Sequence, residues 1–260
     1  MAGERPITVY ANPLSPYVNK VRAFLNLKGL NYRLHYVDPT RQKQELEFSG
    51  QTAVPVVTVG HEVLVDSTPI CLRLEEIFPT HPPGLPADAA LRDKLLALDR
   101  WVSASLIPTG FYTSQNLPLA AKLRNGWLSG TIHSVTAPQG LPLWMKLMWP
   151  VFVVRARFVS GIIDHIDPAT PVSEVRRNAC EDFIARLEGG PFLGGQSSPS
   201  LPDCAAYGHF IPCWMGGMVG YEEFAGYREL AGWVQRMTPL AYTPKPFWPK
   251  QLVRRDPERF

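Results

Sequence analysis

The stretch "ANPLSPYVNKVRAFL", residues 11–25, marks the change from an apolar strand to a helix and decides the fold of the first part of the chain. Residues 7–11 are apolar and β-favouring, whereas the apolar residues after Pro16 recur at the i, i+3, i+7 spacing of one buried helix face. Ser15 stands at the expected helix start, where a hydroxyl accepts hydrogen bonds from exposed amides. The sequence predicts a strand followed by a helix, with Ser15 as a helix cap or as a reactive group.

The next segments continue this alternation of strands and helices. Residues 31–38 alternate between apolar and polar side chains and predict a second strand, and residues 41–48 are polar and helix-favouring. "VPVVTV" and "EVLV" flank Gly60-His61 as the two strands of a hairpin, and a helix is expected over residues 67–78. The predicted order is β-α-β-α-β-β-α, an α/β domain.

A change in composition divides the chain after this first domain. We expect an α/β domain over residues 1–79, a Pro-rich linker over 80–87 and an all-helical domain over 88–260. No strand-like alternation persists beyond the linker, and four long segments there have helical periodicity. Residues 116–139 contain prolines and glycines and are predicted to be irregular, the tail after Met237 is rich in prolines and aromatic residues, and neither has periodicity. We expect both to be ordered surface segments or lids.

The composition excludes several classes of protein. Of the 260 residues, 45% are hydrophobic, and the net charge of +3 is spread along the chain, which does not favour a nucleic-acid partner. The four cysteines form no CxxC pair, and no histidine lies at metal-ligand spacing from them. Together with a start that lacks an apolar signal region, this predicts a cytoplasmic protein with reduced thiols and no bound metal.

The longest apolar run, residues 141–154, contains Lys146 and Pro150 and is shorter than the ~20 residues of a membrane-spanning helix. We therefore expect no transmembrane span. A buried helix or the wall of a pocket is the favoured interpretation. The alternative is a helix that lies in a membrane interface through Trp144 and Trp149.

Two further features occur where predicted strands meet loops or helices. Val54-Pro55 opens a strand, and a proline there on its own does not imply a cis bond. Asp66-Ser67 ends the hairpin and begins a helix, where free amides and the helix dipole hold anions, although a simple cap has the same sequence. Each feature alone is common.

In this order, with the Pro-rich linker and the helical domain after them, these features resemble the glutathione S-transferase superfamily. "SPYVNKVRAFLNLKG" is similar to the first-helix motif of its serine-type members, "AVPVV" to the stretch with its cis-proline, and "DSTPI" to its γ-glutamyl-binding turn. "GGPFLGGQSSPSLPDCAAYG" is similar to the signature in which Ser200 and Asp203 form a structural capping box. The resemblance covers nearly the whole chain.

"KVRAFL", "ELEFS" and "DRWVSASLIPTGFY" look more specifically like the prostaglandin E synthase type 2 branch. Members of that branch usually carry a CPxC-type site, but this chain has Ser15 and Val18 at the two cysteine positions. The departure counts against a thiol-dependent activity, and haem is not expected.

The resemblance implies a site for glutathione, with Ser15 stabilising its thiolate for attack on an electrophile. Its cysteinyl backbone would pair with the edge at Val54 and Pro55, and its γ-glutamyl group would meet Asp66 and Ser67. Lys43 is the expected partner of the glycyl carboxylate. The resemblance also implies a homodimer.

A hydrophobic electrophile is expected between the domains. Its tentative pocket residues are Tyr17, Trp101, Ser105, Phe111, Tyr112 and Trp144, with Met145 as a further cover. Tyr10 and Tyr17 are alternative hydroxyl donors. The function expected from the sequence is a glutathione-dependent transferase; the alternatives are an isomerase or reductase of the prostaglandin E synthase type 2 kind, and a non-catalytic glutathione-binding protein.

Overall fold

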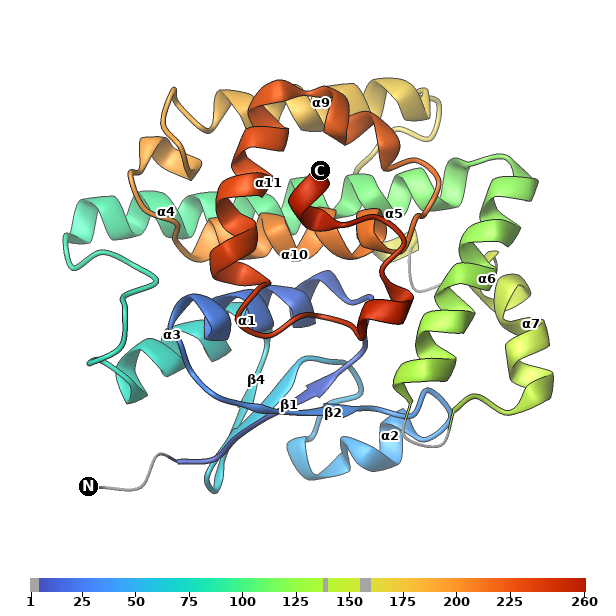
Figure 1. Cartoon of the computed structure of the whole chain (residues 1–260), viewed down its shortest axis with the longest axis horizontal. Helices are drawn as coiled ribbons and strands as arrows, with labels where there is room; N and C mark the ends of the chain where they lie inside the picture. Colours follow the sequence, from blue (N-terminus) through green and yellow to red (C-terminus); the bar gives the residue numbers. More distant parts are fainter. Residues whose placement is uncertain (1–4, 138–139, 155–159) are drawn as a thin grey trace.

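The computed structural model describes residues 5–137, 140–154 and 160–260 (Figure 1). Its sheet has four strands in the order β2-β1-β3-β4, in which β1 and β2 are parallel and the other neighbours antiparallel. The strands are β1 (Ile7–Ala11), β2 (Arg33–Tyr36), β3 (Val56–Val59) and β4 (Glu62–Val65). The helices within this domain are α1 (Pro16–Leu27), α2 (Gln42–Glu45) and α3 (Ser67–Ile77).

The observed order β1-α1-β2-α2-β3-β4-α3 confirms the predicted fold class, a thioredoxin-like domain followed by an all-helical part. The two faces of the sheet are covered by different helices because strand residues alternate in direction. Val9 and Val57 belong to the main core with α1, whereas Val56 packs with Leu46, which ends α2.

The remaining helices form the second part of the chain, above the sheet in Figure 1. They are α4 (Ala89–Trp101), α5 (Ile107–Asn116), α6 (Leu119–Thr136), α7 (Leu143–Val154), α8 (Ser160–Ile163), α9 (Val172–Ala185), α10 (Leu201–Met215) and α11 (Arg228–Ala241). A π-helical turn, Val102–Leu106, joins α4 to α5.

Helix α10 forms the centre of the helical part and lies directly on α1. Almost all of its residues are buried, and Gly208 lies where a Cβ atom would come 2.5 Å from the backbone nitrogen of Lys20. A side chain larger than hydrogen would therefore push the two helices apart. The contact fixes the helical part against the first helix of the sheet domain.

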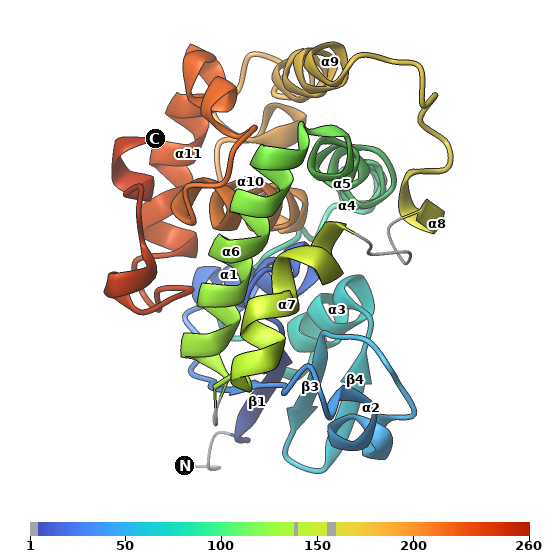
Figure 2. The ribbon, with the colours of Figure 1, turned by 90° about the vertical axis from the view of Figure 1, so that its right-hand side faces the viewer.

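The expectation that residues 116–139 are irregular was wrong, because α6 occupies most of this segment. Its glycines are packing positions and not loop signals. A Cβ atom on Gly126 would lie 2.5 Å from the Pro150 Cα, and one on Gly130 would lie 3.1 Å from the Trp149 ring. The glycines let α7 pack closely against α6, and these two helices lie side by side (Figure 2).

Residues 143–154 of the apolar run form α7, but this helix is not buried, so the favoured interpretation of a buried helix was wrong. Leu143, Trp144 and Leu147 are each more than half exposed. Among the described residues, no helix is both long enough and apolar enough to cross a bilayer.

The tail after Met237 is ordered, with α11 continuing to Ala241 and short 3₁₀ turns beyond. Phe247 and Trp248 are buried, and the Arg22 guanidinium of α1 donates to the Phe247 carbonyl at 2.8 Å. The tail is therefore packed along α1 and belongs to the core of the molecule.

Candidate functional site

Three segments named from the sequence meet at one edge of the sheet. Tyr10, Val56 and Val65 form one row across β1, β3 and β4, because Tyr10 pairs with Val56 and Val56 pairs with Val65. The loop that follows β1, the residues that precede β3 and the turn that follows β4 must therefore leave the sheet at the same edge. This register brings Ser15, Val54-Pro55 and Asp66-Ser67 to one side of the molecule.

Ser15 is the N-cap of α1, and its Oγ accepts a hydrogen bond from the Val18 amide at 3.3 Å. The side chain is partly exposed, and among the described residues its hydroxyl has no acceptor. No acidic residue lies in the first turn of α1, so the positive end of the helix dipole is not neutralised within the helix. The hydroxyl is free to donate to an anion placed at this helix start.

Val54-Pro55 is a cis peptide bond, as the resemblance implied. Val54 is partly exposed, and Pro55 is buried immediately before β3. Val54 therefore offers backbone groups beside the edge at which the three strands meet.

Asp66 has a φ of 65° and a ψ of 134°, a conformation that side-chain-bearing residues seldom adopt. Its exposed carboxylate caps no amide of α3, whereas Ser67 beside it is buried. Tyr17 faces this carboxylate closely enough that burial first, and Asp66 second, raise the pKa of the Tyr17 hydroxyl. Tyr17 therefore remains neutral at pH 7 and can act only as a neutral donor or acceptor.

The loop between β1 and α1 is held by groups that the sequence did not single out. Asn19 Nδ2 donates to the Pro13 carbonyl at 3.2 Å and to the Ser15 carbonyl at 3.0 Å. Trp248 Nε1, from the distant tail, also donates to the Pro13 carbonyl at 3.0 Å. These contacts fix the position of the Ser15 backbone from two directions.

A third contact comes from α6. His133 Nε2 lies 3.2 Å from Asn12 Oδ1, while its Nδ1 lies 2.9 Å from the Ser129 carbonyl. Burial lowers the pKa of His133 to about 4, and its ring stacks on Trp149 of α7 with centroids 4.6 Å apart. The α6–α7 pair is therefore anchored directly to the loop that carries Ser15.

A buried ion pair lies behind the site. Lys20 Nζ of α1 is 2.7 Å from one oxygen of Asp99 on α4 and 2.6 Å from the Thr68 hydroxyl on α3, and Thr68 also donates to Asp99 at 2.7 Å. Lys20 and Asp99 are fully buried. This triad ties the helix after Ser15, the helix after Asp66 and the helical part together.

Two other residues predicted from the sequence, Lys43 and Tyr10, differ in whether a ligand could reach them. Lys43 is exposed on α2 and has no ion pair among the described residues, and the partly buried Tyr10 packs against His35 and Phe48. Lys43 is thus available to a ligand, whereas the contacts of Tyr10 are with its own domain.

Two residues of the expected pocket have structural contacts instead. Tyr112 is 2% exposed, and its hydroxyl donates to the Thr170 carbonyl at 2.7 Å. The Arg186 guanidinium covers the Trp101 ring at 4.0 Å. The buried Tyr112 cannot contact a substrate in this arrangement, so we do not retain it as a pocket residue, whereas Trp101 is partly exposed and its pocket role stays a prediction. Ser105 and Trp144 are exposed and Phe111 is partly buried, and their pocket role stays a prediction.

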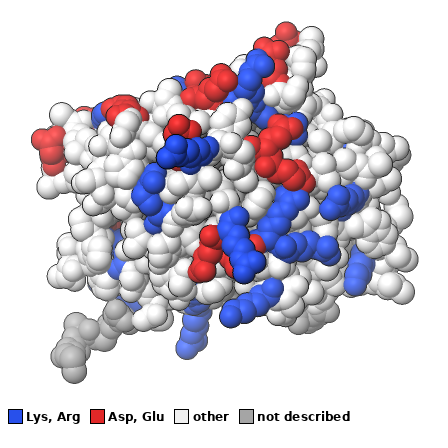
Figure 3. Space-filling view, turned by 45° about the horizontal axis from the view of Figure 1, so that its top comes forward, with Lys and Arg blue, Asp and Glu red and all other residues white. Residues whose placement is uncertain are grey.

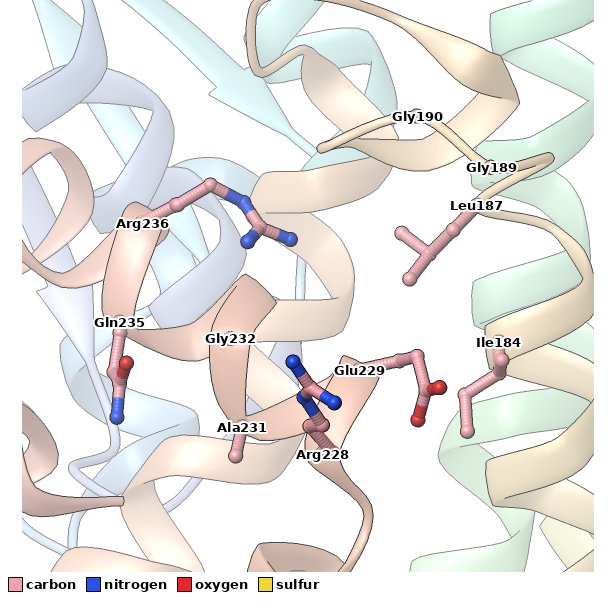
Figure 4. Close-up of a pocket in the computed structure, with 10 residues that line it drawn as sticks. All are labelled: Ile184, Leu187, Gly189, Gly190, Arg228, Glu229, Ala231, Gly232, Gln235 and Arg236. Atoms are coloured by element: carbon pink, nitrogen blue, oxygen red, sulfur yellow. The ribbon is translucent and has the colours of Figure 1, made fainter.

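A cavity of about 580 Å³ lies elsewhere, between α9 and α11 (Figure 4). Arg228, Glu229 and Arg236 line one side of it, and Ile184 and Leu187 line the other. None of the site residues predicted from the sequence lines this cavity.

Within the described residues, no cluster of His, Cys, Asp or Glu could hold a metal ion. Cys71, Cys180, Cys204 and Cys213 form no disulfide in the structure. Burial raises the pKa of each thiol, so none of them is a thiolate at pH 7.

Sequence reasoning missed the groups that position the site: Asn12, Asn19, Lys20, Thr68, Asp99, His133 and Trp248. Lys20 was detectable as a charged residue between the apolar positions of α1, but its partner lies 79 residues away on another helix. Pairings at such distances depend on tertiary packing, and one sequence carries no signal for them.

The comparisons with known proteins agree with this geometry. Residues 9–83 match the family described as "Glutathione S-transferase, N-terminal domain". A glutathione S-transferase from Triticum aestivum is 32% identical over 112 residues, which cover 43% of this chain and 52% of that protein. A maleylpyruvate isomerase from Ralstonia sp. is 35% identical over 94 residues, which cover 35% of this chain and 44% of that protein. The chain thus spans about half the length of the curated relatives it matches.

Among solved structures, glutathione transferase GSTFuA2 from Phanerochaete chrysosporium superposes with a TM-score of 0.65 at 18% identity. The superposition covers 91% of this chain and 98% of that one. The protein therefore has the two-part fold of the glutathione S-transferase superfamily.

Proposed function

We propose that the protein is a serine-type glutathione transferase that uses Ser15 to hold the glutathione thiolate for attack on a hydrophobic electrophile. The observation that carries the proposal is the in-register row Tyr10–Val56–Val65, which gathers the Ser15 loop, Val54-Pro55 and Asp66-Ser67 at one edge. The similarity of residues 9–83 to glutathione S-transferase N-terminal domains supports glutathione as the co-substrate.

Each part of glutathione has a partner of suitable chemistry at this edge. The Asp66 carboxylate, which caps no amide, would bind the γ-glutamyl ammonium, while Ser67 and the first amides of α3 would meet the γ-glutamyl carboxylate. The backbone of Val54 would pair with the cysteinyl residue as an added strand does. Lys43 would meet the glycyl carboxylate.

The chemistry then requires an anionic sulfur beside Ser15. The Ser15 hydroxyl donates to the sulfur, and the free amino end of α1 adds favourable dipole potential, so both lower the pKa of the thiol. Lowering a thiol pKa from ~8.5 to near 7 takes only about 2 kcal/mol. The thiolate attacks the electrophile to form the C–S bond, while either a leaving group departs with its bonding electrons or an electron-poor double bond accepts the electron pair and then a proton from solvent. The thiol proton has already left to solvent.

The experiment is a titration of the purified full chain with glutathione, followed by heat release and by ultraviolet absorbance of the thiolate. We expect saturable binding together with thiolate absorbance at pH 7. Binding without thiolate would point to the non-catalytic glutathione-binding protein, and no binding would contradict the assignment of the site while leaving the fold unaffected.

A second candidate is an isomerase that uses glutathione without consuming it. The similarity to the Ralstonia maleylpyruvate isomerase favours this candidate over a prostaglandin E synthase type 2-like activity, which would need reactive thiols. Measuring free thiol during turnover separates the two: a transferase consumes one glutathione per product, and an isomerase leaves the glutathione concentration constant.

A further inference from the structure

Helix α7 presents an apolar face that no described element covers. Its exposed large side chains and their exposed fractions are Leu143 73%, Trp144 58%, Leu147 56%, Met148 43% and Phe152 45%. They form two adjacent pairs and a fifth residue, repeated at a spacing of four residues, and so occupy one half of the helix surface. The opposite face carries Trp149 and Pro150, which contact α6. The apolar face of α7 therefore points away from α6.

The charged residues of the chain segment that contains this helix are all of one sign. Residues 100–163, about a quarter of the chain, contain no Asp or Glu, although the whole chain has 23 acidic residues. The same segment contains Lys122, Arg124 and Lys146, which have no ion pair among the described residues. The right-hand edge of Figure 3, on the side where α6 and α7 lie in Figure 1, shows Lys and Arg but no Asp or Glu.

We propose that the apolar face of α7, which belongs to this acid-free segment with its cations, docks on the surface of an anionic lipid membrane. A helix with large apolar side chains on one face and basic residues beside it lies in the plane of the interface, with its apolar face among the acyl chains. Trp144 is of the type that favours the headgroup level, and each Lys or Arg near an anionic surface adds attraction. This inference does not depend on the proposed glutathione chemistry.

The charge pattern favours a lipid surface over a second copy of the chain. A two-fold pair built on α7 would place the same patch on both partners, so Lys122, Arg124 and Lys146 of each copy would approach a segment that has no acid. A membrane with anionic headgroups supplies the negative charge that the second copy lacks at this position. Dimerisation through another surface is compatible with the proposal.

The test is co-sedimentation of the full chain with phosphatidylcholine vesicles and with vesicles that also contain phosphatidylglycerol. We expect the protein to sediment with the anionic vesicles and to be released as salt is raised. Leu147→Ser should lower the partition coefficient about tenfold, because an exposed apolar side chain is lost from the inserted face. Leu240→Ser, on the exposed part of α11, is the matched control and should leave partitioning unchanged.

The electrostatic part is tested by Lys146→Gln, which should weaken partitioning to anionic vesicles about fivefold, with Lys250→Gln as its control. Equal partitioning to neutral and anionic vesicles, or no sedimentation at all, would overturn the proposal. It would also be overturned if ultracentrifugation without lipid showed a dimer that Leu147→Ser dissociates, since the face would then be covered by a second copy.

Discussion

Two helices in this protein begin with a serine cap close to a proline, and they differ in what surrounds the cap. Ser200, at the start of α10, is buried, and both its amide and its hydroxyl donate to Asp203, at 2.9 and 3.1 Å. Ser15, at the start of α1, is partly exposed and makes a single side-chain contact, with the Val18 amide.

This difference in hydrogen bonding distinguishes the structural cap at Ser200 from the candidate binding site at Ser15. Asp203 also accepts from the Leu193 amide and from Trp233 Nε1, so the cap of α10 is closed by four donors. The first turn of α1 has no acidic residue, so its positive end remains open to an external anion. The same kind of helix start therefore stabilises the fold at one place and can bind a ligand at the other.

The largest effect is expected from Asp203→Ala. It leaves the buried Leu193 amide and the Trp233 indole without their acceptor, and we expect the free energy of unfolding to fall by about 3 kcal/mol. Urea denaturation measures this change. Asp88→Ala removes the exposed cap of α4, which accepts only from Leu91, and should cost about 1 kcal/mol. An equal loss of unfolding free energy in the Asp203 and Asp88 variants would contradict the distinction between the closed cap of α10 and an exposed cap.

Ser15→Ala tests the open cap. We expect conjugation of glutathione to an electrophile to fall about 10²-fold, because the donor to the developing charge is lost. The free energy of unfolding should fall by only about 1 kcal/mol, as for an ordinary cap. Steady-state kinetics and urea denaturation on the same preparation measure both changes, and Ser15→Thr, which keeps the hydroxyl, should recover part of the activity. Unchanged turnover in Ser15→Ala would rule out the assigned role.

Asp66→Asn extends the test to the neighbouring helix start. We expect the dissociation constant for glutathione to rise about tenfold, because a charge-assisted hydrogen bond to the ammonium is replaced by a neutral one. Isothermal titration calorimetry measures this change, with Asp93→Asn on the exposed face of α4 as the control. The same affinity in the Asp66 and Asp93 variants would remove Asp66 from the site.

The smallest effect concerns pH. Burial lowers the pKa of His133 to about 4 and that of His209 to about 3, so the unfolded chain takes up protons below pH 6.5 that the folded chain does not. Burial raises the pKa of Asp203 to about 6, which acts in the opposite direction as the pH falls. We expect the free energy of unfolding to drop by about 1 kcal/mol from pH 7 to pH 6.

Denaturation curves at the two pH values check the sign of this change. If the free energy of unfolding rose on acidification, the contribution from protonation of Asp203 would be larger than the combined contribution of His133 and His209.

The sequence predicted the elements of the sheet domain well because each has its own local signal. The alternation before Gly60, the turn at Gly60-His61 and the Ser-Pro start of α1 are all visible within a few residues. Local signals failed at α6, where Gly126 and Gly130 look like loop residues but face α7 across a helix contact. A glycine required by a neighbouring helix cannot be distinguished from a turn glycine without that neighbour.

The candidate site divides in the same way. Ser15, Val54, Pro55, Asp66 and Ser67 could be named because they stand at strand and helix ends, and the sheet register brings those ends together. The pocket residues were less accessible to sequence reasoning. Tyr112 and Trp101 have aromatic side chains suited to a pocket, but their contacts are with Thr170 and Arg186.

The sequence by itself determined the order of strands and helices, the two helix starts with their serine caps, and the apolar and acid-free character of residues 100–163. Only the tertiary structure decided which cap is closed and which is open, which helix holds the Ser15 loop, and that the apolar face of α7 is left uncovered. The physical reason is range: capping and periodicity act between residues a few positions apart, whereas burial and the pairing of Lys20 with Asp99 arise from packing between segments far apart in the chain.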